Sequence, residues 1–335
     1  MNLRSVCWSA TCIVLVASCT FGQTPSTGAS PERGTKAPAS IARTRDGHPD
    51  LEGIWSFATL TPLERPAAFS GKAQLTDQEA AEFAKRTIEN RNFDRRDGGA
   101  AADVSRAYND LFYDFGKKAS NQTSLIIDPA DGKLPALTPA GEKRAADRAA
   151  KLARVPEGPE DRPLWERCIL GFNSGPPIMP SGYNNNLQIL LPPGYAVIFT
   201  EMVHSARVVP LDGRSHGGVR QLTGDSRGRW EGDTLVIDTV NFTGQGTGTI
   251  GLRVGTDENF RLTERFRLRD PQTLIYEFTV DDPTVWTKPW TASVPMSKSD
   301  EPIYEYACHE GNYGMQDILA GARAQEKAEA DSKAK

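Results

Sequence analysis

One short segment, residues 304–315, gathers three side chains that can do chemistry. It reads YEYACHEGNYGM and places Cys308, His309 and Glu310 side by side. A thiol beside an imidazole can act as a nucleophile with its base, an imidazole beside a carboxylate can transfer protons, and all three can bind a metal ion. Residues 302–310 are expected to form a strand, where neighbouring side chains point to opposite faces, so Cys308 and His309 are not expected to touch.

The cysteine count favours a disulfide over a thiol nucleophile. Three of the five cysteines, Cys7, Cys12 and Cys19, lie in or at the end of an apolar N-terminal stretch. If that stretch is removed on export, only Cys168 and Cys308 remain, and two cysteines in an exported chain favour a disulfide. We therefore expect a Cys168–Cys308 disulfide that holds the end of the last strand and the loop after it.

The candidate catalytic residues are His309, His204 and Glu310. An imidazole can donate and accept a proton near neutral pH, and a neighbouring Glu310 could orient His309 or charge it. His204 is the best second imidazole, because its expected neighbours along the strand leave space around it. The alternative, in which these histidines are surface residues hydrogen-bonded to a loop, stays open.

A metal site has the right residue types but not the right spacing. The chain has four histidines, His48, His204, His216 and His309, and carboxylates near three of them, which would suit zinc or non-haem iron. Glu201 and His204 are three apart on an expected strand, so they would face opposite sides. We predict no cofactor, and a metal-assisted reaction stays an alternative.

Two further motifs are expected to carry no chemistry. The sequence GTGTIG at 246–251 matches the glycine pattern of a dinucleotide site, but no helix pattern follows it, so we expect a loop at the mouth of a barrel. No Gly-x-Ser-x-Gly elbow of a serine hydrolase occurs, and Ser226 in GDSRG is expected in a turn.

Aromatic and amide side chains in the same half of the chain predict a pocket for a small organic molecule or a sugar. The candidate ligand-binding residues are Asn185, Arg207, Trp230 and Tyr313. Glycines and asparagines near 181–186 and 310–315 predict loops, where binding residues often lie. A structural role for the tryptophans in the core is the alternative.

The N-terminus predicts export to the periplasm or the cell surface. Arg4 precedes an apolar stretch at 6–17, which is far shorter than the ~20 residues of a membrane span, so residues 1–19 are predicted to be a signal peptide. The small residues before Cys19 resemble a bacterial lipobox, which would make Cys19 the lipid attachment site. Ordinary cleavage near Gly22 stays open. The lipid would be the only contact with the envelope.

Composition and pattern set the domain organisation. The formal net charge of −4 argues against a nucleic-acid partner. Residues 20–45 are poor in apolar residues and rich in proline, which predicts a disordered linker. One large domain is expected at 46–323, with a charged tail at 324–335. A helical insertion is expected at 75–155, with Thr76 and Thr138 as the N-caps of its two helices.

The second half of the domain predicts a mainly β fold. From about residue 187, strands alternate with short turns, which is typical of an antiparallel meander closed into a barrel or curved sheet, and a helix follows at the C-terminus. Residues 195–209 are expected to form one strand covered on both faces. At 261–268, Leu262 and Phe266 place Glu264 on the interior face, so its buried carboxylate needs a partner, for which Arg207 is the candidate.

Several stretches taken together resemble a family of exported bacterial proteins found in acidobacteria and planctomycetes. They are TSLIIDPADGKLP, NNNLQI, TEMVHSARVVPLDGRSH, GDSRGRWEGDTLVIDTVNF and YEYACHEGNYGM. This resemblance implies export and assigns no activity. The GIWSF stretch and the meander are also similar to the calycin (lipocalin-like) group, from which the helical insertion departs.

The leading functional hypothesis is an exported small-molecule-binding protein of a β-barrel type, with acid–base chemistry as an option. The first alternative is a periplasmic hydrolase, lyase or isomerase that uses His204, His309 and a carboxylate. The second alternative is a structural envelope protein with a filled barrel. A cavity inside the barrel would separate the second alternative from the other two hypotheses.

Overall fold

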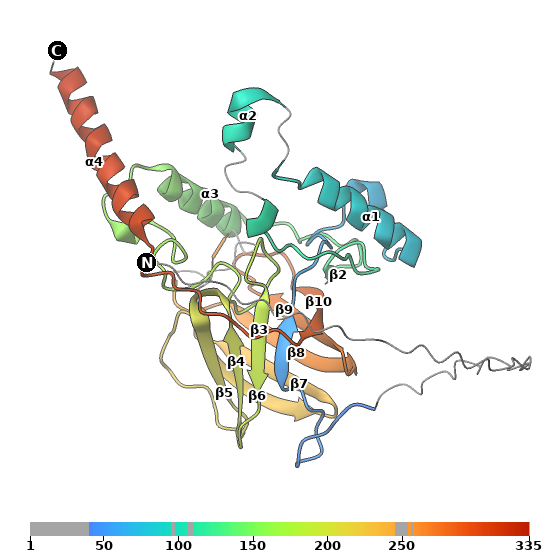
Figure 1. Ribbon diagram of the computed structural model, residues 1–335. Coiled ribbons are helices and arrows are strands. Elements are labelled where there is room, and N and C mark those ends of the chain that lie inside the picture. The colour runs from blue at the N-terminus through green and yellow to red at the C-terminus, as the bar shows by residue number, and fades with distance from the viewer. Residues whose placement is uncertain (1–39, 95–97, 106–109, 245–253, 256, 335) are drawn as a thin grey trace, which may run out of the picture. The chain divides into compact units, whose positions relative to one another are not determined.

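The computed structural model describes residues 40–94, 98–105, 110–244, 254–255 and 257–334. The strands of this described part form a single antiparallel sheet that curves around a common interior (Figure 1). The strands are β1 (Gly53–Ser56), β2 (Ile126–Asp128), β3 (Asn186–Leu190), β4 (Tyr195–Thr200), β5 (Ser205–Pro210), β6 (Asp225–Glu231), β7 (Thr234–Val240), β8 (Arg261–Asp270), β9 (Thr273–Asp281) and β10 (Trp290–Ser299).

The sheet has the order β5-β4-β3-β1-β10-β9-β8-β7-β6, and the short β2 also pairs with β10. Its two terminal strands, β5 and β6, meet and nearly close a barrel. Gly228 of β6 permits this approach, since a Cβ there would lie 2.5 Å from Leu211 and 3.0 Å from Val209. The prediction of a mainly β, barrel-like antiparallel sheet is therefore confirmed.

The expected alternation along β8 is also confirmed. Leu262, Glu264 and Phe266 are each at most 1% exposed and face the interior. Hairpins connect β6 to β7 and β8 to β9 at the predicted turns, and every strand pair in the sheet is antiparallel. The short turns at these two hairpins explain why their strands are antiparallel, because they leave no room for a crossover.

The helices are α1 (Asp77–Asn90), α2 (Gly99–Ser105), α3 (Pro139–Ala153) and α4 (Tyr313–Lys333), with single 3₁₀ turns at η1 (Ala67–Phe69), η2 (Asp110–Phe112), η3 (Pro159–Asp161) and η4 (Met202–His204). Thr76 and Glu79 form the predicted capping box of α1, and Thr138 caps α3 with Pro139 at its first position. The last helix, α4, continues to Lys333 through the stretch that was predicted as a charged tail.

The single strand predicted at 195–209 is wrong, because the chain reverses in its middle. The predicted cover on both faces is also wrong, since Tyr195 and Val208 are exposed. Strands β4 and β5 form a hairpin, and the turn between them holds Val203 at φ 55° and His204 at φ 36°. The apolar run on both faces hid the turn, since it lacks the glycine or asparagine that usually adopts a positive φ.

The strand predicted at 302–310 is also wrong, because these residues form a loop and turns. The sheet offers them no position: β10 already pairs with β9 on one side and with β1 and β2 on the other. With no ladder, the alternation of faces assumed for Cys308 and His309 does not apply. The last residues of the predicted linker are ordered, and Arg43 pairs with Asp233 at 2.9 Å.

Candidate functional site

The interior of the barrel is filled by side chains. The residues that line it are 0 or 1% exposed, which leaves no surface that a ligand could contact between them. They include Trp55, Leu187, Ile189, Leu235, Ile237, Leu262, Phe266, Tyr276, Phe278 and Val294. The barrel is therefore a packed core and not a binding cavity.

Arg207, a predicted ligand-binding residue, points into this core and pairs with Glu264. Its Nη2 donates to Glu264 Oε1 at 2.9 Å and its Nη1 donates to Oε2, so the pair is bidentate. Tyr276 donates its hydroxyl to the same Oε1 at 2.8 Å. Burial opposes the charge on Arg207, but the charge and hydrogen bonds of Glu264 raise the pKa of Arg207 above its ordinary value. The partner predicted for Glu264 is confirmed.

A buried segment, residues 170–179, is packed against the barrel core. The Ile178 N–H donates to the Tyr276 hydroxyl at 3.1 Å, which ties this segment to the group of Arg207 and Glu264. Gly171 allows close packing, because a Cβ there would lie 2.1 Å from Cγ of Met202. Burial, reinforced by the charge of Glu264, raises the pKa of Tyr276 well above its ordinary value.

The structure contains the predicted Cys168–Cys308 disulfide, which joins the chain just before residues 170–179 to the loop before α4. An aromatic cluster lies beside it, in which Phe172 packs edge-on against Tyr183 at 5.3 Å between ring centroids. Tyr306 stacks with Tyr183 at 6.5 Å. The 3₁₀ turn η4 contributes Met202 and Val203 to the same cluster.

The predicted catalytic residues lie at the edge of this cluster, on two segments that the disulfide and Val203 bring together. His204, His309 and Glu310 are all exposed. Neither imidazole has a side-chain hydrogen bond or ion pair within the part of the chain that the structure describes. The geometry thus places the two histidine-bearing segments at one cluster without forming an acid–base pair, and their catalytic role stays a prediction.

The other predicted ligand-binding residues lie apart from each other. Asn185 is fully buried, and its Nδ2 donates to the backbone oxygen of Asp114 at 2.6 Å. Trp230 is half-buried and stacks on His48 with 4.4 Å between ring centroids. Tyr313 is the first residue of α4 and is 69% exposed. The structure does not gather these side chains into one pocket.

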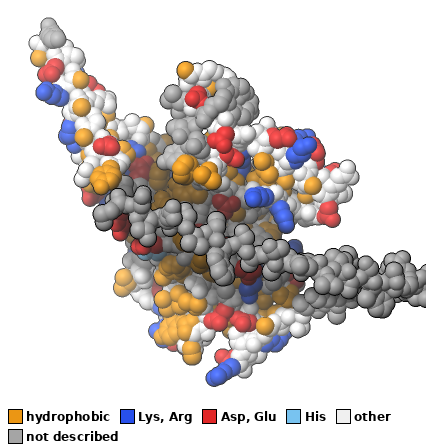
Figure 2. Space-filling view, in the orientation of Figure 1, with side chains coloured by type: hydrophobic (Ala, Val, Ile, Leu, Met, Phe, Trp, Pro, Cys, Tyr) orange, Lys and Arg blue, Asp and Glu red, His pale blue; other side chains and the backbone are white. Residues whose placement is uncertain are grey.

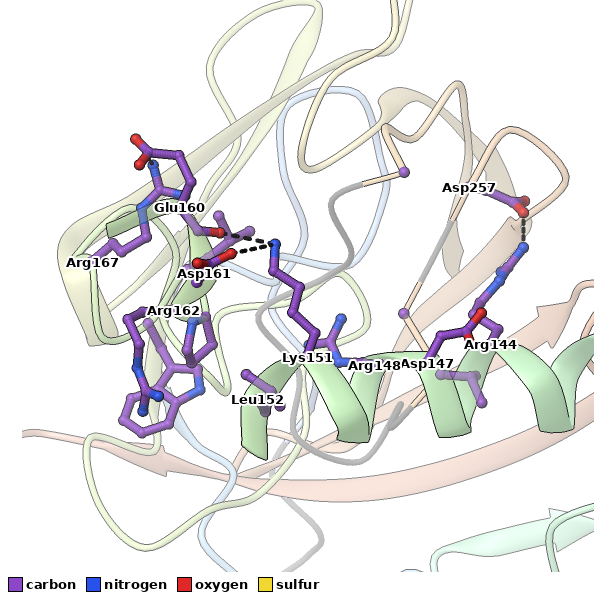
Figure 3. A pocket seen from close by; sticks show the side chains of 16 residues that line it. Arg144, Asp147, Arg148, Lys151, Leu152, Glu160, Asp161, Arg162, Arg167 and Asp257 are labelled. Atoms are coloured by element: carbon purple, nitrogen blue, oxygen red, sulfur yellow. Dashed lines mark hydrogen bonds and ion pairs between the residues drawn. The ribbon is translucent and has the colours of Figure 1, made fainter. Parts of the chain in front are cut away.

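A pocket of about 740 Å³ lies outside the barrel, beside α3 (Figure 3). One wall is the face of α3 that carries Arg144, Arg148 and Lys151, at helical spacings of four and three. The rest of the lining comes from residues 160–165, 167, 244, 254, 255 and 257. The lining contains five cations and four carboxylates, together with apolar side chains such as Leu152, Leu164 and Trp165.

Acidic partners match the cations at both ends of this pocket. Arg144 donates to Asp257, and Lys151 lies 3.5 Å from Asp161 (Figure 3). Arg162 holds Glu166 through two hydrogen bonds of 2.6 and 2.9 Å, and the bonded carboxylate raises the pKa of Arg162. Hydrogen bonding from the Glu157 N–H, followed by nearby cations, lowers the pKa of Asp161.

Arg148 differs from these cations, because it has no ion pair or hydrogen bond within the described residues. It is partly buried, and this burial lowers the pKa of Arg148 below its ordinary value. A desolvated guanidinium without a counter-charge is costly, so it is poised to accept an anion. The pocket can therefore bind an anionic group next to an apolar surface.

Sequence reasoning missed this pocket because α3 looks like an ordinary charged surface helix. The useful signal was the spacing of Arg144, Arg148 and Lys151, which puts three cations on one helix face. Trp165 and Arg167 follow in a segment without regular structure, only a few residues before Cys168.

Within the described ranges, no group of three or more His, Cys, Asp or Glu side chains is placed to hold a metal ion. The glycine-rich stretch at 246–251 lies outside the described residues. On the face shown in Figure 2, acidic and basic side chains are interspersed and not gathered by sign. None of the helices in the described part combines the length and apolar character that a membrane span requires.

Comparison with known proteins adds no assignment. No protein-family model matches the chain, and no curated protein matches it either. The function therefore has to be inferred from the geometry alone.

Proposed function

We propose that the protein is an exported small-molecule-binding protein in which the barrel is the scaffold and the α3 pocket is the binding site. The observation that carries this proposal is the contrast between the barrel interior and the α3 pocket. The barrel interior is filled, while the α3 pocket has a volume of about 740 Å³. Pockets for small organic ligands usually measure about 300–1,000 Å³.

The lining of the pocket supports a binding role. Such sites combine apolar walls with a few polar groups that orient the ligand. Here Leu152 and Trp165, each 40% exposed, supply apolar surface, and Arg148 supplies a polar group that has no partner among the described residues. The hollow beside α1 has about 640 Å³, but alanines and the stems of lysines make up much of its lining, and it offers no aromatic surface.

Export is part of the proposal. The N-terminal pattern, the resemblance to exported bacterial proteins and the Cys168–Cys308 disulfide support it, since such bonds persist mainly in oxidising compartments. Cys19, which lies outside the described residues, is proposed as a lipid attachment site. Mass spectrometry of the mature N-terminus tests both points, and a Cys19→Ser variant that still partitions into detergent would contradict the lipid.

A pair of matched variants tests the binding site. Leu152 and Leu190 are both 40% exposed, but only Leu152 lines the pocket. Leu152→Trp should fill part of the pocket, whereas Leu190→Trp enlarges a side chain on β3 elsewhere. A library of small organic acids, neutral aromatics and sugars is screened against the wild type and both variants by ligand-observed NMR.

Compounds that bind the wild type and Leu190→Trp, but not Leu152→Trp, would support the proposal. If every compound that binds the wild type also binds Leu152→Trp with unchanged affinity, the α3 pocket is not the site. If no compound of any class binds the wild type, the proposed function is wrong and the filled barrel favours a structural role.

A further inference from the structure

We infer that the ligand of the α3 pocket is a small organic monoanion, a carboxylate on a flat apolar body, and that Arg148 binds the carboxylate. This inference rests on the proposed function and names its ligand class. It follows from three features of the pocket: an unmatched cation, the balance of charge around it, and the exposed indole in its wall.

Arg148, which has no acidic partner among the described residues, lies on α3 between two cations that do have acidic partners. Figure 3 shows Arg148 on α3 between Arg144, which is joined to Asp257, and Lys151, which donates to the backbone oxygen of Glu160 and lies 3.5 Å from Asp161. Asp147, one residue before Arg148, is taken by Lys143, whose Nζ lies 2.6 Å from its Oδ2. The Glu160 carboxylate lies 3.8 Å from Arg167. Each of these acids therefore has another partner, and the Arg148 guanidinium, which has none among the described residues, is left for a ligand.

The charge balance points to one negative charge. Five cations and four carboxylates line the pocket, so a single anionic group would neutralise it. A dianion would bring excess charge close to Asp147, Glu160 and Asp161, which line the same space. A carboxylate also matches the planar fork of a guanidinium, which can donate two parallel hydrogen bonds to it.

The apolar part of the ligand is inferred from Trp165 and Leu152. Trp165 is 40% exposed although Phe172 packs edge-on against its indole, with ring centroids 6.1 Å apart. That contact fixes the ring and leaves surface free on the pocket side. A fixed and exposed indole is a stacking surface for a flat ring, and Leu152 offers aliphatic contact on the facing helix.

The test compares 2-naphthoate with its uncharged amide, 2-naphthamide, by isothermal titration calorimetry on the full mature protein. Naphthoate should bind at least about tenfold more tightly than naphthamide, as expected for hydrogen bonds to a charged group. Arg148→Gln should remove this preference and leave naphthamide binding unchanged. Arg148→Lys should restore part of the preference, since lysine keeps the charge without the fork.

The matched control is Arg86→Gln, which removes an exposed arginine from α1 that lines neither pocket. It should leave both affinities as in the wild type. Equal affinity for naphthoate and naphthamide, with both lost in Trp165→Ala, would overturn the monoanion inference and leave the binding site intact. If neither probe binds the wild type, the inference is wrong as stated. The library screen with Leu152→Trp then decides separately whether the pocket binds other compounds.

Discussion

Arg207 on β5 and Glu264 on β8 form a bidentate ion pair across the interior of the barrel, with Nη2 and Oε1 2.9 Å apart. The Glu264 side chain is completely buried and that of Arg207 is 10% exposed. The two residues lie on strands that are not neighbours in the sheet, so the pair ties the end strand β5 to β8, which lies near the opposite end of the strand order. The pair occupies the guanidinium and the carboxylate, so neither group is left for a ligand.

Arg207→Met should destabilise the protein strongly, because it leaves the Glu264 carboxylate buried without its counter-charge. Removal of one partner of a buried pair typically costs about 3–5 kcal/mol. Glu264→Leu together with Arg207→Met should cost less than Arg207→Met alone, since no charge remains buried. Urea unfolding of the single and double variants measures this. A double variant less stable than Arg207→Met would contradict the explanation.

Tyr276 should make stability fall at alkaline pH. Its pKa is raised well above the ordinary value in the folded state, so above pH ~10 the unfolded chain releases this proton while the folded chain keeps it. The unfolded state then binds fewer protons, and the unfolding free energy falls by about 1.4 kcal/mol per pH unit from this group. The contribution of Tyr276 to stability is fully present below pH ~10.

The measurement is the difference in unfolding free energy between the wild type and Tyr276→Phe from pH 8 to 11. Other titrating groups occur in both proteins and cancel in the difference. The advantage of the wild type should shrink as the pH rises above ~10. A difference that stays constant over this range would show that Tyr276 does not hold its proton in the fold.

Local sequence signals predicted much of the fold. The capping box of Thr76 and the N-cap at Thr138 are local patterns, and the alternation around Glu264 follows from strand geometry. They succeed because each depends on residues a few positions apart. The turn at Val203 could not be predicted in this way, since Met202 and Val203 pack in a cluster with Tyr306 and Cys308, which lie far away in the sequence.

The candidate site was less accessible to sequence reasoning. Arg207 was correctly matched with Glu264, but the same pairing removes it from ligand binding. Asn185 was expected in a loop, but it is fully buried, and its Nδ2 donates to the backbone oxygen of Ser181. The α3 pocket depends on contacts between residues far apart in the chain, such as Arg144 with Asp257, and no short motif encodes them.

The two exposed histidines test the enzyme hypothesis. His204→Gln and His309→Gln should each leave the affinity of the α3 pocket within about twofold of the wild type, because neither residue lines it. Their melting temperatures should also change little, as expected for exposed positions. Calorimetry with 2-naphthoate and thermal unfolding provide the measurements. If a turnover assay on the library compounds finds activity that both variants lose, the protein is an enzyme and the acid–base hypothesis is correct.

The disulfide should affect both stability and the pocket. Cys168 and Cys308 are 140 residues apart, and the loop-entropy model assigns a bridge of this length roughly 4–5 kcal/mol as an upper figure. Cys168 directly follows Arg167 in the sequence, and both Arg167 and Trp165 line the pocket. The bridge therefore anchors this wall of the pocket. Asn312 adds a second tie, since its Nδ2 donates to the backbone oxygen of Glu166 at 2.9 Å.

Thiol titration of the unfolded mature protein should therefore find no free thiol. Replacing both cysteines by serine should lower the unfolding free energy and also weaken 2-naphthoate binding, because the wall that carries Trp165 loses its anchor. Asn312→Ala serves as a milder variant that keeps the bridge and removes the hydrogen bond. Two titratable thiols would disprove the disulfide. Unchanged naphthoate affinity in the double-serine variant would show instead that the pocket wall holds its shape without it.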